Sequence, residues 1–174
     1  MSDISMAQKA SSAQIAFREG MSRLGAAVTL ITTDGPAGRY GMTATAVCSV
    51  TDAPPTLLVC INQSARSHDM FIENGVLCVN VLAGGNDELA TRFARANEED
   101  RFGASAWEVG VTGAPVLPGA LTAFECRIVD RLKKGTHSVF ICEVVSTING
   151  TEETGLLWFG RRYHQLPALE HSQS

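Results

Sequence analysis

The chain alternates between short apolar stretches and clusters of turn-forming residues. Apolar or alternating stretches of strand length occur at 26–33, 41–50, 56–62, 76–82, 121–130, 135–148, 156–159 and 161–166. Helical spacing predicts short helices at 12–24, 68–74 and 86–95, whereas 96–118 is predicted to be irregular. Because consecutive strands mostly lack a helical crossover, we expect an antiparallel sheet. Apolar strands need protected edges, so the pattern favours a mainly β fold, a small Greek-key barrel.

The stretch Gly41–Val50 has an unusual pattern of side chains. Read as one strand, its core-facing side would carry small apolar groups, those of Met42, Ala44, Ala46, Cys48 and Val50. The other side would carry three hydroxyls with one valine, from Thr43, Thr45, Val47 and Ser49. Such a side lets a flat polar ligand lie close to the backbone. Alternatively, this is an ordinary half-buried strand in which Thr serves β-propensity.

A polar loop follows the strand at 56–62, which is apolar throughout and is therefore expected to be buried on both faces. The loop contains Asn62, Ser64, Arg66 and Ser67, just ahead of a predicted helix start. Backbone N–H groups at a helix start suit a phosphate, and Arg66 can add a charge-assisted hydrogen bond. Alternatively, Ser67 is a plain N-cap and Arg66 is solvated. The strand and the loop together fit a ligand with a flat polar ring and a phosphate tail.

Two further candidates lie near strand ends in the second half of the chain. His137 follows Gly135-Thr136 and opens the longest strand, a position typical of a barrel rim. Trp158 and Tyr163 can offer aromatic faces to a ring. Alternatively, His137 is a solvated turn residue, and the two aromatic side chains belong to the core or to an interface.

The composition narrows the functional classes. The 174 residues carry a net charge of −4 without a basic patch, so nucleic acid is not an expected partner. No apolar run reaches the roughly 18 residues of a membrane span, and the amino terminus lacks the pattern of a secretory signal. The five cysteines and four histidines show no metal spacing. We read the cysteines as reduced and structural, in a cytoplasmic protein.

No repeat, low-complexity segment or linker divides the chain. We therefore expect one domain at 11–166, with flexible tails at 1–10 and 167–174. Neither a dinucleotide-binding Gly-x-Gly-x-x-Gly after a strand nor a Walker phosphate loop is present in the sequence.

The order and spacing of these pieces resemble the short-chain flavin reductase family, the reductase components of two-component flavin monooxygenases. The resemblance spans residues 17–166. It is carried by 21–33, 41–50, Pro54-Pro55, Asn62, Ser64, Ser67, Phe71, Asn80, Phe93, Arg101-Phe102, Gly135–His137 and Tyr163-His164. It is strongest toward the members that serve pyrimidine-ring opening and 4-hydroxyphenylacetate hydroxylation.

The resemblance implies an FMN-binding split β-barrel that works as a homodimer and transfers a hydride from NADH or NADPH to N5 of FMN or FAD. It implies that a segment with its backbone N–H groups lies beside the flavin ring, formed by Thr43, Ala44, Thr45, Ala46, Val47, Cys48 and Ser49. It also implies a set that holds the ribityl chain and phosphate: Asn62, Ser64, Arg66 and Ser67. Phe102 would approach the same site, Tyr163 would close it, and His137 would position the nicotinamide.

Two positions depart from the family pattern, Cys48 in place of a hydroxyl residue and Thr136 in place of Asp. Because the flavin performs the chemistry, no protein nucleophile is needed. The expected function is therefore an NAD(P)H:flavin oxidoreductase that supplies reduced flavin to a partner monooxygenase. The alternatives are a flavin-dependent reductase of a second acceptor, such as a cobalt corrinoid in cobalamin synthesis, a non-catalytic flavin- or haem-binding barrel, and a structural dimer without flavin.

Overall fold

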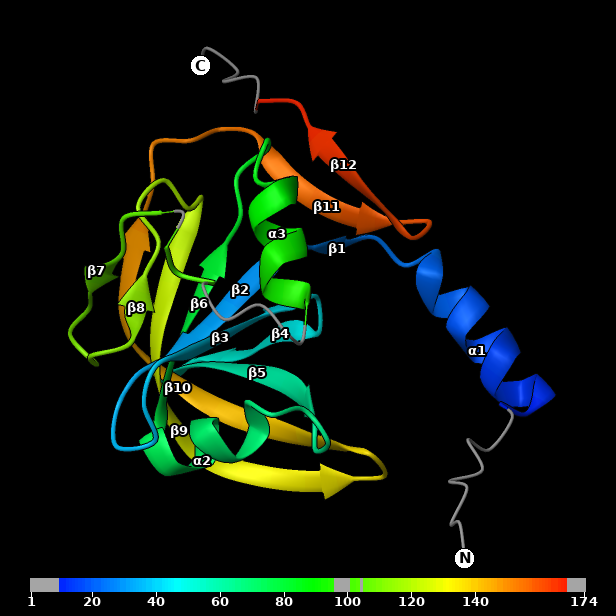
Figure 1. The fold of residues 1–174 in the computed structure, drawn as a ribbon, viewed down its shortest axis with the longest axis horizontal. Helices are drawn as coiled ribbons and strands as arrows, with labels where there is room; N and C mark the ends of the chain where they lie inside the picture. The colour runs from blue at the N-terminus through cyan, green and yellow to red at the C-terminus, as the bar shows by residue number, and fades with distance from the viewer. Residues whose placement is uncertain (1–9, 96–100, 104, 169–174) are drawn as a thin grey trace, which may run out of the picture.

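The computed structural model describes residues 10–95, 101–103 and 105–168, so most of the two predicted tails lies outside the described residues. Its helices are α1 (Ser12–Ser22), α2 (His68–Asn74) and α3 (Asp87–Ala94) (Figure 1). Its strands are β1 (Ala26–Ala27), β2 (Thr29–Thr33), β3 (Tyr40–Ala44), β4 (Val47–Asp52), β5 (Pro55–Asn62), β6 (Val76–Val81), β7 (Glu108–Val109), β8 (Pro115–Val116), β9 (Thr122–Lys134), β10 (His137–Asn149), β11 (Gly155–Phe159) and β12 (Arg162–Leu166).

Seven strands form one antiparallel sheet in the order β3-β2-β6-β9-β10-β5-β4. β3 and β4 lie at its two edges, yet only Thr45 and Ala46 separate them along the chain. A flat seven-stranded sheet would hold its edges about 29 Å apart, whereas the three Cα–Cα steps of this link reach about 11 Å. The sheet must therefore curl until its edges meet at the link, which produces a barrel split between β3 and β4. The predicted fold class is confirmed.

The stretch 41–50 is two strands, and its prediction as one strand is wrong. β3 pairs with β2, whereas β4 pairs with β5, and the link between them changes which side chains face inward. Val47 packs against the core that contains Ala44. Ala46 and Cys48, predicted to face the core, are exposed and line a surface groove. A change of one residue in register moves every later side chain to the opposite face, so alternation in the sequence could not reveal it.

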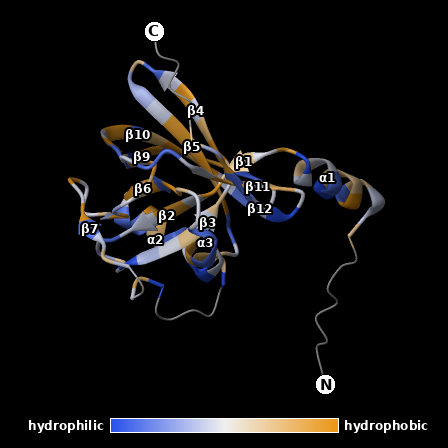
Figure 2. Ribbon diagram, turned by 90° about the horizontal axis from the view of Figure 1, so that it is seen from above, coloured by the Kyte–Doolittle hydropathy of each residue, from blue (hydrophilic) through white to orange (hydrophobic). Residues whose placement is uncertain are grey.

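The interior of the barrel is filled from alternate residues of its strands. On β5 these are Leu57, Val59 and Ile61, which pack in one cluster with Phe140 of β10. The apolar stretches of β5 and β10 are coloured orange in Figure 2. Leu58, between two buried residues, is only half-buried, so the prediction that β5 is buried on both faces is wrong. A second cluster lies under α3 and contains Val28, Leu30, Leu82, Ala90, Phe93, Leu117, Ala120 and Leu156.

α1 projects from this body as an arm (Figure 1). Ser11 caps it through a capping box in which the Gln14 N–H donates to Ser11 Oγ at 3.2 Å and the Ser11 N–H donates to Gln14 Oε1 at 2.8 Å. Near its end, Glu19 forms an ion pair of 2.9 Å with Arg161. None of its residues is buried, and the Phe17 side chain is 68% exposed. The apolar residues of α1 therefore lack cover from the described part of this chain.

A second antiparallel sheet, in the order β1-β11-β12, lies beside the β3–β4 link. Its register places Trp158 opposite both Ala26 and Tyr163. Two other predicted boundaries need correction. The segment predicted to be irregular contains the hairpin β7–β8, and β9 continues to Lys134 rather than ending at Asp130. The added length of β9 pairs with the start of β10, so the hairpin tip extends beyond the barrel wall.

Candidate active site

One row of side chains lies on the outer face of β4, β5 and β10. His137 pairs with Asn62 of β5, and Cys48 of β4 pairs with Leu58 of β5. Directly paired residues of an antiparallel sheet share a face, and Cys60 lies on that face between the two pairs because side chains alternate. We call these five residues the outer row. The alternate residues of β5 fill the barrel, which keeps the outer row pointing away from the core.

A groove of about 750 Å³ runs along the β4 end of the outer row. Its volume is within the range of about 300–1,000 Å³ that is usual for small-molecule sites. One wall comes from α1, through Phe17 and Met21, and small side chains such as those of Ala27 and Ala46 line the other parts. The groove is therefore broad, mostly apolar and shaped for a flat molecule. Asn62 and His137 continue the same face beyond its lining.

A smaller cavity of about 230 Å³ shares Thr45 and Trp158 with the groove. Tyr163 closes one side of this cavity, with its ring centroid 4.9 Å from that of Trp158. Thr43 also lines it, but the Thr43 hydroxyl donates to the Ala90 carbonyl of α3 at 2.5 Å. This hydroxyl therefore holds β3 against α3, whereas the exposed Thr45 faces both cavities.

The loop between β5 and α2 has a fixed shape at its start. Asn62 Oδ1 accepts hydrogen bonds from the N–H and the hydroxyl of Ser64, both at 2.9 Å, which is an Asx turn. Gln63 Nε2–H donates to the His137 carbonyl at 2.9 Å, and the Gln63 N–H donates to the Thr136 carbonyl at 2.9 Å. The loop and the β9–β10 hairpin are therefore connected through Gln63, a residue that the sequence analysis did not select.

Ser64 and Arg66 are exposed on this loop, but Ser67 is only 1% exposed. Ser67 occupies the N-cap position of α2, but its hydroxyl donates to Met42 Sδ at 3.4 Å and makes no capping bond to the helix. A capping side chain usually goes with an extended backbone, whereas Ser67 has φ −75° and ψ −20°. Ser64 and Arg66 are therefore the residues of this loop whose polar side chains are exposed and can contact a ligand.

His137 is exposed at the tip of the β9–β10 hairpin. A two-residue turn precedes it, and Gly135 at the first central position has φ +56°, which glycine adopts without strain. His137 Nδ1 lies 2.9 Å from Thr136 Oγ1. Because Nδ1 is engaged in this way, contact with a ligand through the imidazole falls to Nε2.

Phe102 lines neither of the two cavities. Its ring packs with those of Phe93 at 5.2 Å and Trp107 at 5.0 Å between centroids. The cluster presses on β3 at Gly41, where an added Cβ would lie 2.5 Å from Phe93 Cε1 and 3.3 Å from Phe102 Cζ. Phe102 therefore supports β3 in this structure, and the glycine is required by the close approach of the rings.

The five free thiols differ in depth. Burial raises the pKa of Cys78 and Cys142 to about 12, and it also raises the pKa of Cys126. Burial raises the pKa of Cys60 in the groove as well. Cys48 is exposed, so the prediction of buried structural cysteines is wrong for this residue.

Among residues 10–95, 101–103 and 105–168, no group of three or more His, Cys, Asp or Glu side chains is arranged to hold a metal ion. No helix in that part of the chain has both the length and the apolar character needed to cross a membrane. Besides Thr45 on the β3–β4 link, exposed polar side chains of the site lie on the loop 62–67 and at the hairpin tip.

Residues 21–167 match the flavin reductase like domain. The chain belongs to this family. It is 55% identical over 156 residues to the FMN reductase (NADH) RutF of Pseudomonas syringae pv. syringae, which covers 89% of this chain and 88% of the relative. The Streptomyces globisporus NADH:FAD oxidoreductase SgcE6, in complex with NAD and FAD fragments, superposes with a TM-score of 0.82 at 30% identity, over 88% of this chain and 92% of that chain. BorF, the flavin reductase component of a bacterial two-component tryptophan halogenase, also gives a TM-score of 0.82 at 30% identity, over 89% and 99%.

The resemblance stated from the sequence is confirmed by these matches. Within this flavin reductase, the structure brings Asn62 next to His137, and it places Thr45 and Tyr163 in the lining of the same small cavity. It does not bring Phe102 to either cavity. Gln63 gave no signal in the sequence because its partners are backbone carbonyls more than seventy residues away.

Proposed function

We propose that this chain is an NADH-dependent FMN reductase that supplies reduced flavin to a partner monooxygenase. The observation that carries the proposal is the pairing of Asn62 with His137 at the end of the outer row. The first residue opens the predicted flavin loop and the second is the predicted nicotinamide contact, so the two substrates would meet there. Membership of the family, and a 55% identical relative named FMN reductase (NADH), support FMN and NADH over FAD and NADPH.

The groove suits the ring of a flavin. Thr45, Ala46 and Cys48 line it with small side chains, so a flat ring can approach the backbone of Ala44–Ser49, including Val47. Thr45 and Ala46 lie outside both strands, and we assign their N–H groups to N1 and O2 of the ring, where the reduced flavin carries negative charge. When bound, the flavin supplies the chemistry by accepting a hydride at N5.

The loop after β5 would bind the ribityl chain and the phosphate. Arg66 is exposed and offers the phosphate a charge-assisted hydrogen bond, and Ser64 offers its hydroxyl. Asn62 uses Oδ1 within the loop, so it would contact the ribityl chain through its NH₂ group. Ser67 would contribute its backbone N–H, because its hydroxyl already donates to Met42.

His137 would position the nicotinamide. The Thr136 hydroxyl holds His137 Nδ1 at 2.9 Å, at the position where the family pattern has Asp, and Nε2 would then bind the carboxamide. Tyr163 and Trp158 would close the smaller cavity beside the ring. Phe102 would act indirectly, because its ring supports β3 and does not contact the ligand. In this mechanism the side chains bind and orient two substrates, and none serves as acid, base or nucleophile.

A second copy of the chain would complete the enzyme. An isolated helix as short as α1 is marginal in water, and Phe17 and Leu24 are 68% and 61% exposed. α1 also forms a wall of the groove. A partner chain that covers α1 and the groove would bury Phe17 and Leu24 and would enclose the flavin. The enzyme would then be a homodimer. The free thiols support a cytoplasmic location.

The test is NADH oxidation by the purified protein with and without added FMN. We expect turnover that rises with FMN. In His137→Ala we expect kcat/KM for NADH to fall by about a hundredfold, the cost of a misplaced substrate, while the dissociation constant of FMN changes little. His164→Ala is the matched control, because His164 is also an exposed histidine but lies on β12. This variant should behave as the wild type.

The other outcomes distinguish the alternatives. Turnover only with bound flavin and a second acceptor, such as a cobalt corrinoid, would show a prosthetic flavin and a dedicated target. Flavin binding without turnover would leave a binding barrel. Equal losses of NADH oxidation and FMN binding in His137→Ala would contradict the nicotinamide role of His137.

A further inference from the structure

We infer that Gln63 and His68 are positioning residues that hold the loop 62–67 in a fixed place relative to His137. The inference rests on the proposed function, in which the loop binds the flavin and His137 binds the nicotinamide. Both ends of the loop are attached to the same hairpin, by Gln63 at its start and by His68 just after its end.

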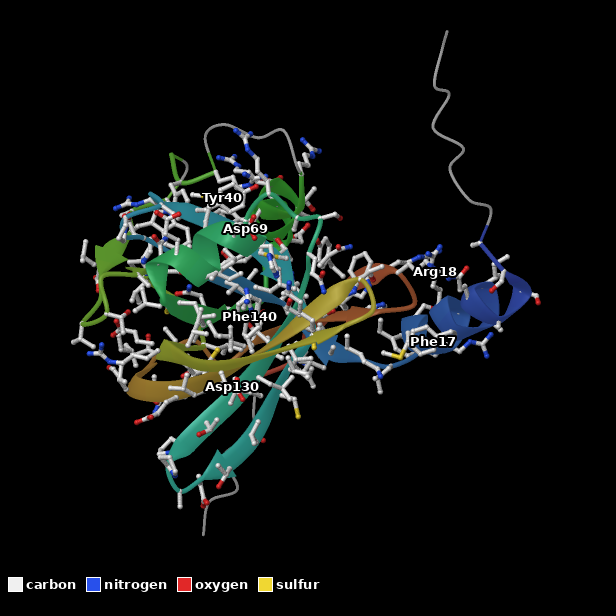
Figure 3. All side chains as sticks on the ribbon, turned by 90° about the horizontal axis from the view of Figure 1, so that it is seen from below. Phe17, Arg18, Tyr40, Asp69, Asp130 and Phe140 are labelled. Atoms are coloured by element: carbon white, nitrogen blue, oxygen red, sulfur yellow. The ribbon has the colours of Figure 1, made fainter. Side chains whose placement is uncertain are left out.

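His68, at the start of α2, is only 5% exposed. Its Nε2 lies 2.9 Å from Ser138 Oγ, and its Nδ1 lies 2.8 Å from Asp69 Oδ1. Its ring meets that of Phe140 edge-on, with 5.7 Å between centroids. Figure 3 labels Asp69 on α2 and Phe140 on β10. Ser138 directly follows His137, so His68 contacts the strand one residue from the proposed nicotinamide contact.

The Asp69 carboxylate can only accept a hydrogen bond, so His68 Nδ1–H donates to it, and Nε2 is left to bond with the Ser138 hydroxyl. Ser, His and Asp are arranged here as in a hydrolytic triad. However, Ser138 is 0% exposed, pairs with the buried Ile61, and lines neither cavity. Since no substrate can reach its hydroxyl, the contact serves to attach α2 to β10.

Gln63 makes the second attachment. Its Nε2–H donates to the carbonyls of His137 at 2.9 Å and Gly135 at 3.4 Å, and its N–H donates to the Thr136 carbonyl at 2.9 Å. These bonds span the whole turn that presents His137. Between the two attachments lie Ser64 and Arg66, whose side chains are exposed.

The consequence for hydride transfer follows from distance. Reacting atoms must approach to about 3–3.5 Å, and a displacement of about 1 Å can lower the rate by about a hundredfold. One substrate is held by the loop and the other by the hairpin. Relative motion of the loop and the hairpin therefore changes the distance between the two reacting atoms. The two attachments restrict this motion.

The experiment uses the full chain with Ser138→Ala, which removes the bond to His68, and Gln63→Ala, which removes the two side-chain bonds of Gln63 and leaves its backbone bond to the Thr136 carbonyl. Ser146→Ala, on the same strand, is the matched control. We measure hydrogen exchange of residues 62–68, the dissociation constant of FMN, and kcat and KM for NADH. Both variants should exchange faster in this segment, bind FMN more weakly, and lose about tenfold in kcat/KM, while Ser146→Ala matches the wild type.

A pair of His68 variants tests whether the hydrogen bond matters beyond packing. His68→Phe keeps a ring against Phe140 but loses the bond to Ser138, whereas His68→Gln can place an amide where Nε2 lay. We expect the Gln variant to retain more activity than the Phe variant. Equal activity of the two would overturn the role assigned to the bond.

A double-mutant cycle tests whether the attachment acts through His137. In a His137→Ala background, Ser138→Ala should no longer alter KM for NADH but should still weaken FMN binding. Additive effects on NADH would overturn the inference. So would a lower melting temperature with unchanged exchange, FMN binding and NADH kinetics, since that is the result of a merely structural role.

Failure of the proposed function would look different. If the wild type itself did not oxidise NADH with FMN, the reductase assignment would be lost. The exchange measurement would still decide the attachment: faster exchange of 62–68 in both variants supports it, and exchange equal to that of the wild type overturns it.

Discussion

The inner face of β5 carries Leu57, Val59 and Ile61, all buried in the barrel, whereas its outer face carries Leu58, Cys60 and Asn62, which are half-buried. The two sets alternate along the same eight-residue strand. Hydropathy does not distinguish the two sets, because each contains a leucine, Leu57 on the inner face and Leu58 on the outer face. They differ in what covers them, since the inner set contacts other strands and part of the outer set lines a groove.

This difference shows how one strand can stabilise the fold and form the site at once. Close packing of the inner set fixes the backbone, and the backbone in turn fixes the spacing of the outer row from Cys48 to His137. The outer face does not need to contribute much to stability, so it can stay open to a ligand. Substitutions on the two faces should therefore change different measurable quantities.

The largest effect should come from a matched pair of leucine substitutions on β5. Leu57→Ala leaves a cavity in the core and should lower the free energy of unfolding by about 2–5 kcal/mol. Leu58→Ala, at a half-buried position in the groove, should lower it by about 1 kcal/mol or less and should weaken FMN binding instead. Urea unfolding and FMN titration of both variants measure this contrast. Equal losses of stability would show that the groove face is part of the core.

Alkaline pH should destabilise the fold through the cysteines that are buried in it. Burial raises the pKa of Cys142 from 9.0 to about 12, so above pH 9 the unfolded chain loses a thiol proton that the folded chain keeps. Stability is thus fully present below pH 9 and falls as pH rises toward 12, by about 1.4 kcal/mol per pH unit for each such thiol.

Urea unfolding between pH 8 and 11 tests this prediction. Cys142→Ala should give a shallower decline of the unfolding free energy than the wild type. Parallel slopes for the two proteins would contradict the raised pKa of Cys142 and its burial in the core.

The sequence predicted most of the strands, the split-barrel class and the family, because these depend on local patterns and on motif order. It could not predict the break at Thr45–Ala46. The residues on either side alternate as one strand would, and the break exists only because β2 and β5, the partners of β3 and β4, lie on opposite sides of the split. Closure of a sheet is a tertiary constraint that alternation does not encode.

The site was predictable as a set of residues but not as an arrangement. Leu58 and Cys60 looked like core because apolar composition does not reveal what covers a side chain. The contact between Asn62 and His137 depends on pairing across 75 positions, which a single sequence does not display. The sequence offers the Ser67 hydroxyl to a phosphate or to a helix cap, yet it donates to Met42, a residue 25 positions away.

The smallest expected effect concerns Cys48. The rate at which a thiol reagent labels each cysteine compares the outer face with the buried one. Without denaturant, a disulfide thiol reagent should label Cys48 fastest and Cys60 more slowly, while Cys78, Cys126 and Cys142 should react only after unfolding. Saturating FMN should slow the labelling of Cys48, because the proposed ring position lies along β4. Cys48→Ser should abolish the fast phase and change the dissociation constant of FMN by less than about threefold, as expected for a surface substitution. Labelling of Cys48 at the same rate with and without FMN would show that the flavin does not lie along β4 and that the groove is not its binding site.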